Sequence, residues 1–219
     1  LRRCRILRCV HVVNYSDPED HPELGDQRRR ATADSAAQRM ARIRERNASL
    51  TGTAAIEAAR EVALRQLDAR ARSRAELHTA ITSRGFSSDV ADDVLDRLER
   101  VGLVDDRAFA AMFVKDRFSL GGKAGRALAA DLAKRGVALE LINEALSEIS
   151  HEDEQVRARQ LVDAKKRSVL SRGLDGAERD KAFRRLTGML ARKGYGAHVC
   201  VSVVGAALNE WSRESDDDI

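Results

Sequence analysis

Three stretches of the chain share one pattern: LHTAITSRGFSSDVADDVL at 77–95, LAADLAKRGVALELINEAL at 128–146 and LTGMLARKGYGAHVCVSVV at 186–204. Each holds a basic residue followed by a glycine, and these glycines are Gly85, Gly136 and Gly194. Apolar residues stand eight and four positions before each glycine, and five and ten positions after it. Such intervals are typical of one helix face, and glycine readily takes the left-handed conformation that ends a helix. The pattern predicts pairs of helices joined at a glycine turn.

Repeats of this kind predict a modular molecule. Gly136 follows Gly85 by 51 residues and Gly194 follows Gly136 by 58, which leaves room for a third helix in the first two copies. A unit of this size buries little surface alone and gains stability by packing on its neighbours. We therefore predict an all-α fold of tandem three-helix, helix-turn-helix-like repeats in an elongated array. The predicted boundaries are a leading helix over 53–72 and repeats over 73–120, 121–172 and 173–211, with a long helix over 152–170.

The composition favours helices and excludes several other classes of protein. Charged residues make up 34% of the chain, aromatic residues make up 4%, and both prolines lie before position 23. Ala, Leu, Arg and Glu dominate the rest and are good helix formers, which argues against an all-β fold. No apolar run approaches the roughly eighteen residues of a membrane span. The start of the chain lacks the pattern of a secretory signal, so we expect a cytoplasmic protein.

The charges are distributed unevenly along the chain. Residues 27–75 hold twelve arginines against five acids, although the whole chain carries only +4. Residues 1–50 lack a steady apolar period, so we predict a flexible basic tail over 1–52 whose removal leaves stability nearly unchanged. An acidic tail that frays is predicted over 212–219. A basic balance permits contact with nucleic acid without requiring it, and a coding bias towards arginine explains it equally.

Residues with the spacing of a catalytic or metal site are not found in the sequence. The three cysteines suggest neither a disulfide framework nor a closed zinc site. Gly121-Gly122-Lys123 lacks the earlier glycine and the following Ser or Thr of a phosphate loop. Asp105 and Asp106 are better explained as the N-cap and first-turn acid of a helix than as metal ligands. We expect no enzyme, no cofactor and no metal.

The repeats raise the possibility of a groove-reading DNA binder, but their second helices are acidic and would be repelled by phosphates. Positive charge lies elsewhere. Lys181, Arg185 and Arg192 fall within about 40° on a helical wheel, opposite Leu186 and Leu190. Such a stripe is either an ordinary solvated face or a surface for an acidic or nucleoprotein partner. The candidate partner- or DNA-binding residues are Arg126, Lys134, Arg157, Arg159, Lys165, Lys166, Arg167, Lys181, Arg184, Arg185, Arg192 and Lys193.

Four segments carry a resemblance to a known family. AREVALRQLDARARSRAEL (59–77), GLVDDRAFAAMFVKDR (102–117), GGKAGRALAADLAKRGV (121–137) and RKGY (192–195) resemble the RecX regulatory proteins in order and spacing. The resemblance implies tandem three-helix repeats and a non-enzymatic protein that binds the RecA filament on single-stranded DNA. It further implies inhibition of the recombinase, ATPase and co-protease activities of RecA, and hence modulation of DNA repair and the SOS response.

Further expectations concern partners and rival functions. The resemblance allows direct binding to single- or double-stranded DNA, and we expect a monomer that has no membrane partner. One rival hypothesis is sequence-independent nucleic-acid binding through the basic segment 27–75, which predicts a steep dependence on salt. Another is a helical adaptor without a nucleic-acid role, which predicts no effect on RecA or DNA.

Overall fold

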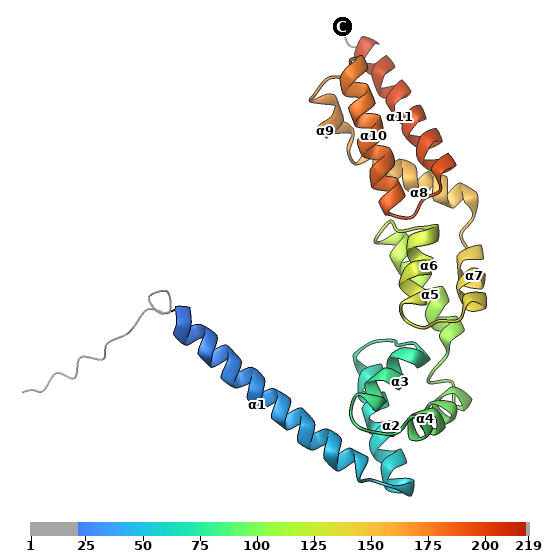
Figure 1. Ribbon diagram of the computed structural model, residues 1–219. Coiled ribbons are helices and arrows are strands. Elements are labelled where there is room, and N and C mark those ends of the chain that lie inside the picture. Colours follow the sequence, from blue (N-terminus) through green and yellow to red (C-terminus); the bar gives the residue numbers. More distant parts are fainter. Residues whose placement is uncertain (1–21, 218–219) are drawn as a thin grey trace, which may run out of the picture.

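The computed structural model describes residues 22–217, and within that range it contains helices and no strands (Figure 1). The all-α prediction is therefore confirmed. The helices are α1 (Pro22–Ala48), α2 (Gly52–Ala69), α3 (Arg74–Thr82), α4 (Ser88–Arg100), α5 (Asp106–Ser119), α6 (Gly125–Ala133), α7 (Leu139–Ser147), α8 (His151–Asp163), α9 (Lys166–Leu170), α10 (Gly176–Arg192) and α11 (Ala197–Asp217).

Three separate cores lie one after another along the molecule (Figure 1). The first unit packs α2, α3 and α4 around Leu77 and Leu95. The second packs α5, α6 and α7 around Leu128 and Leu132. The third packs α8, α10 and α11 around Trp211, which is fully buried. The predicted elongated array of three-helix units is thus present.

The units are divided differently from the predicted boundaries 73–120, 121–172 and 173–211. In the structure the additional helix precedes each glycine-centred pair instead of following it. For example, Phe109 and Val114 of α5 pack against Leu128 and Leu132 of α6, in the second core. The leading helix predicted over 53–72 corresponds to α2 and belongs to the first unit. The repeat pattern located the helix pairs, but it carried no signal for the side on which the extra helix packs.

The predicted helix over 152–170 is also divided. α8 ends at Asp163, and α9 begins at Lys166 after a tight turn in which Lys165 N donates to Val162 O at 2.8 Å. Val162 and Val169 are both buried in the third core. Because they are seven residues apart, they would share a face of one straight helix too, so their spacing gave no sign of the break.

Side-chain caps and glycine turns mark several helix ends. The Ser73 hydroxyl accepts from Glu76 N at 3.1 Å, and the Glu76 carboxylate accepts from Ser73 N at 3.3 Å, so the two residues form a capping box. Asp105 caps α5 by accepting from Ala108 N at 3.0 Å. Gly136 and Gly194 have φ of 73° and 99° and lie against the preceding unit. A Cβ would collide with Ala75 at Gly136 and with the Ala124 carbonyl at Gly194, so these glycines serve both turn and junction.

The backbone carbonyl of the residue before each of the three glycines accepts a hydrogen bond from α1 or from the preceding unit. The carbonyl of Arg84 accepts from Asn47 Nδ2 at 2.8 Å. The carbonyl of Arg135 accepts from Ser73 Oγ at 2.5 Å. The carbonyl of Lys193 accepts from Ala124 N at 2.9 Å. These carbonyls stand at helix ends, where no later turn supplies a donor, and each junction supplies a different one.

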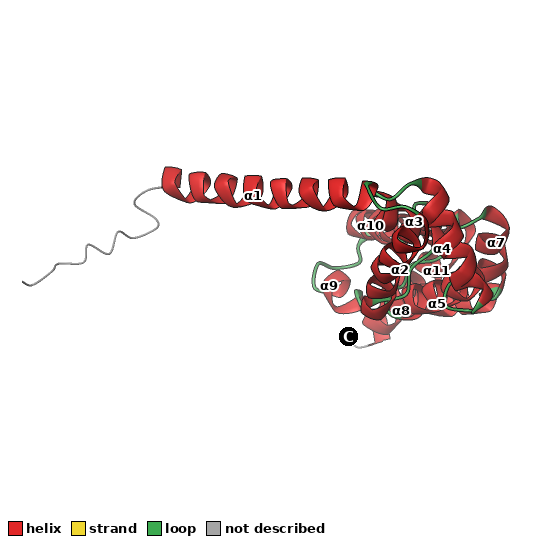
Figure 2. Cartoon of the chain, turned by 90° about the horizontal axis from the view of Figure 1, so that it is seen from below, coloured by secondary structure: helices red, strands yellow, loops and turns green. Residues whose placement is uncertain are grey.

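The N-terminal segment differs from the predicted flexible tail over 1–52. Residues 22–48 form α1, which projects from the row of units (Figure 2). Its last turn docks on the first unit: Asn47 is buried, and Arg44 Nε donates to Ser83 O at 2.8 Å. An apolar period did not reveal this contact because it is made by polar side chains. Residues 1–21 lie outside the described range.

The predicted acidic tail over 212–219 is likewise largely helical. α11 continues to Asp217, and Glu214 pairs with Lys166 at the start of α9. Asp218 and Ile219 lie outside the described residues. The C-terminal end of α11 is therefore held within the third unit by its ion pair to α9 as well as by the core around Trp211.

Candidate partner-binding surface

Several of the candidate cations are engaged inside the molecule. Arg159 pairs with Asp163 and with Glu210 of α11, both at 2.9 Å. Lys166 pairs with Glu214. Arg157 donates to the Ser119 carbonyl and to Gln160, and Lys193 Nζ donates to the Gly121 carbonyl at 2.9 Å. These side chains tie α8 and α9 to α11 and the second unit to the third, so they have a structural role.

Other candidates remain available to a partner. Arg184 is exposed and, among residues 22–217, donates only to the Asp180 carbonyl of its own helix. Six further cations are exposed and make no ion pair or side-chain hydrogen bond within the part of the chain that the structure describes. They are Arg126, Lys134, Lys165, Arg167, Arg185 and Arg192.

The predicted stripe on α10 lies on the expected face. Leu186 and Leu190 are buried on the opposite side, while Lys181, Arg185 and Arg192 are exposed. Lys181 and Arg185 line a cleft of about 210 Å³. Glu178 also lines it and pairs with Lys181 at 2.6 Å, which raises the pKa of that lysine. The stripe is thus cationic, with one of its three charges partly neutralised.

The junction between the first and second units holds a charged cluster that sequence reasoning did not single out. Glu76 meets Arg135 at 2.6 Å, Arg70 at 3.1 Å and Arg72 at 3.9 Å. Burial opposes the charge of Glu76, but the hydrogen bonds that its carboxylate accepts from Arg70 and from Ser73 N, together with the charge of Arg135, outweigh burial and lower the pKa of Glu76. The alternating arginines at 70, 72 and 74 are the sequence signal for this cluster. By charge alone, however, they belong to the basic segment 27–75.

Arg74 anchors the other side of this junction. Its backbone N donates to Asp106 of α5 at 2.7 Å, and its guanidinium meets Asp96 and Glu99 of α4 at 2.8 and 2.9 Å. Burial works against the charge on Arg74, but these carboxylates raise its pKa. For Asp106, burial dominates over the bond from Arg74 N and raises the pKa. Asp106 is therefore a junction residue, and Asp105 alone acts as the cap.

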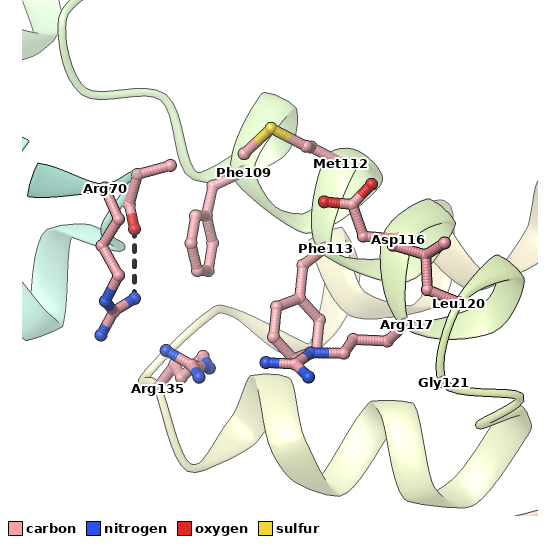
Figure 3. Close-up of a pocket in the computed structure, with 10 residues that line it drawn as sticks. Arg70, Phe109, Met112, Phe113, Asp116, Arg117, Leu120, Gly121 and Arg135 are labelled. Carbon is pink, nitrogen blue, oxygen red and sulfur yellow. Dashed lines mark hydrogen bonds between the residues drawn. The ribbon is translucent and has the colours of Figure 1, made fainter.

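A cleft of about 320 Å³ opens beside this cluster, between the end of α2 and the helices α5 and α6 (Figure 3). Phe109, Met112 and Phe113 of α5 line it together with Leu120. Arg70, Arg117 and Arg135 stand around these apolar side chains (Figure 3). The cleft is thus apolar within and basic at its edge.

Among the described residues, no group of His, Cys, Asp and Glu is arranged to hold a metal ion. Within the same part of the chain, no helix is both long and apolar enough to cross a lipid bilayer. The surfaces described above are suited to binding a macromolecule through charge and apolar contact.

Known proteins resemble this chain in the parts just described. The family model described as RecX, first three-helix domain, matches residues 59–98, and that of the second three-helix domain matches 105–146. Regulatory protein RecX of Mycolicibacterium vanbaalenii is 49% identical over 159 residues, which cover 72% of this chain and 86% of that protein. The chain belongs to the RecX family.

Other RecX proteins extend the comparison. Regulatory protein RecX of Streptomyces coelicolor is 43% identical over 161 residues, covering 74% of this chain and 83% of that one. The crystal structure of RecX from Lactobacillus salivarius superposes with a TM-score of 0.61 at 17% identity, covering 69% of this chain and 95% of that one. The two RecX domain models coincide with the units α2–α4 and α5–α7, so family and packing divide the chain alike.

Proposed function

We propose that this protein regulates RecA by binding the RecA filament on single-stranded DNA and inhibiting its recombinase, ATPase and co-protease activities. The observation that carries the proposal is membership of the RecX family of regulatory proteins. By this role the protein modulates DNA repair and the SOS response. It acts by binding, without a catalytic site of its own.

The shape of the molecule supports a filament as the partner. Three units in a row offer a long surface that can contact more than one subunit of a repeating assembly. Exposed cations that have no partner among the described residues are spread over the second and third units, among them Arg126, Lys134 and Arg185. Such charges bind phosphates or carboxylates without first breaking an ion pair.

The acidic helices fit this role better than they fit DNA reading. Arg74 forms ion pairs with three acidic residues on the exposed face of α4, namely Asp92, Asp96 and Glu99. A recognition helix with this face would be repelled in a major groove. The positive surface of α10 and the basic cleft at the first junction are the better contacts for a nucleoprotein.

RecA-driven strand exchange on single-stranded DNA tests the proposal. Purified protein added in sub-stoichiometric amounts should slow or stop the exchange, because each bound molecule affects more of the filament than the subunits it touches. Normal exchange at every ratio tested would overturn the proposed function.

A second candidate function is sequence-independent nucleic-acid binding through the basic N-terminal segment. One feature favours it: α1 projects from the array and exposes Arg39, Arg42 and Arg46 (Figure 2). This candidate predicts tight binding to naked DNA with a steep salt dependence. Reversal of Arg28, Arg29 and Arg30 to glutamate should then weaken DNA binding more than RecA inhibition.

A further inference from the structure

The cleft at the junction between the first and second units exposes apolar side chains that contribute little to a core. Leu120 is 86% exposed and Met112 is 47% exposed. Phe109, by contrast, is buried in the second core and forms a fixed floor, with the Phe113 ring 6.1 Å from its own. Water contact with Leu120 and Met112 is unfavourable, so burial of both residues by a partner side chain favours binding.

The edge of the cleft carries more positive than negative charge. Arg70 and Arg135 share a single carboxylate, Glu76. Arg117 is exposed and forms no ion pair within the described residues. Asp116 is the one acidic residue among the described residues that line the cleft. The cationic edge is therefore only partly neutralised and remains attractive to carboxylates.

The arginines are held in place before any partner arrives. The guanidinium carbons of Arg135 and Arg117 lie 5.0 and 5.5 Å from the centre of the Phe113 ring, within reach of a cation–π contact. Figure 3 shows both guanidinium groups facing the same ring. A side chain fixed in this way loses less entropy on binding, and Arg, Met and aromatic residues are enriched at the centres of protein interfaces.

We propose that this cleft binds an acidic protein segment that carries one large apolar side chain. The apolar side chain enters between Phe109, Met112 and Leu120, and flanking carboxylates pair with Arg117 and Arg135. This assignment rests on the function proposed above: the acidic segment belongs to RecA within the filament. Aliphatic side chains at the mouth and Asp116 in the lining favour this occupant over a nucleic-acid strand, whose phosphates Asp116 repels.

Variants of exposed residues test the assignment. Leu120→Asp and Arg117→Glu should each raise the concentration needed for half-maximal inhibition of RecA by at least about tenfold, as loss of a central contact does. Leu139→Asp on α7 and Lys115→Glu on the same helix α5 are the matched controls. Both control residues are exposed and lie outside the cleft, so their variants should stay within about twofold of the wild type.

A photocrosslinking amino acid provides a readout that does not depend on variant activity. Placed at position 120 it should crosslink to RecA in the filament, and placed at position 139 it should not. Thermal melts of every variant establish that the fold is intact. Unchanged inhibition by both folded cleft variants, or an absence of crosslinks at position 120, overturns the assignment.

Two other outcomes are also decisive. If the cleft variants lose affinity for naked oligothymidylate as strongly as they lose inhibition, the cleft is a nucleic-acid site and the acidic segment is rejected. A wild-type protein that leaves the filament unaffected overturns the proposed function and this assignment together. Normal wild-type inhibition with unaffected cleft variants overturns this assignment alone.

Discussion

Asp106 has two opposing effects on stability. Its hydrogen bond to the backbone of Arg74 stabilises the fold, whereas burial of its charge destabilises it. Its carboxylate accepts from Arg74 N across the first junction, while burial raises its pKa. For a carboxyl group, a raised pKa means stability that is present at low pH and lost as pH rises through the folded value. Asp106→Asn keeps an acceptor without the charge, so stability at neutral pH should stay equal or rise slightly. Asp106→Ala should lower it by about 1–3 kcal/mol, since Arg74 N loses its partner. Urea unfolding of both variants checks this, and a loss in Asn equal to that in Ala would contradict it.

The burial of Tyr195 leads to a prediction that absorbance spectroscopy can test. It is fully buried, and burial is the main cause that raises its pKa to about 12. The chain contains two tyrosines. Absorbance of tyrosinate during an alkaline titration should therefore show Tyr195 ionising near pH 12, with stability falling as pH rises above about 10, the value in an unfolded chain. Tyr195→Phe removes that step and serves as the control. Ionisation of Tyr195 near pH 10 in the folded protein would show that it is not buried.

Residues also mark the limit of prediction from the sequence. Capping by Ser73 and Asp105 and the glycine turns were predictable because each involves neighbours within a few positions. The engagement of Arg159 and Lys166 was not, because their partners Glu210 and Glu214 stand 51 and 48 residues away. Charge in a sequence shows where a cation stands, but only the fold shows whether it is already paired.

At the scale of elements, α1 behaves as the neighbour that the first unit would otherwise lack. Asn47 supplies to Arg84 O the bond that Ser73 supplies to Arg135 O at the next junction. A hydrogen bond from a polar side chain to a distant backbone carbonyl leaves no trace in the apolar period, so the sequence predicts a flexible tail where α1 docks. The helix pairs were predictable from periodicity, whereas the side on which each third helix packs was not.

Shortening the N-terminal segment tests this role of α1. Deleting residues 1–34 leaves Arg44 and Asn47 in place and should leave the melting temperature nearly unchanged. Asn47→Ala leaves the Arg84 carbonyl without its donor and should cost about 1–3 kcal/mol. That corresponds to about 2–4 °C for each kcal/mol in a chain of this size. Asn47→Asp is a useful companion, because it keeps the shape but not the donor. Melting of Asn47→Ala at the wild-type temperature would show that the contact does not stabilise the fold.

At the scale of the whole molecule, the row of units separates the surfaces that could meet a filament. The stripe on α10 and the cleft at the first junction belong to different units, so both can contact one extended partner. Reversing Lys181, Arg185 and Arg192 to glutamate should spare the fold, because all three are exposed. Inhibition of RecA should weaken strongly. If the stripe meets single-stranded DNA, the log–log salt slope of binding should fall by about 0.7 for each lost phosphate contact.

The matched variant for the stripe is the reversal of Arg28, Arg29 and Arg30 in the N-terminal segment. It changes the same number of charges and should weaken binding to naked DNA more than inhibition of RecA. Circular dichroism of both variants verifies that helices are retained. Loss of inhibition in the N-terminal variant together with full inhibition by the stripe variant would assign the working surface to the basic segment instead.

The ATPase rate of RecA on single-stranded DNA directly measures the proposed action of this protein on the RecA filament. Sub-stoichiometric protein added during steady hydrolysis should lower the rate by more than its molar share of RecA. The protein alone should hydrolyse no ATP, so the measured rate belongs to RecA throughout. A rate that stays unchanged up to equimolar protein would show that this protein does not inhibit RecA.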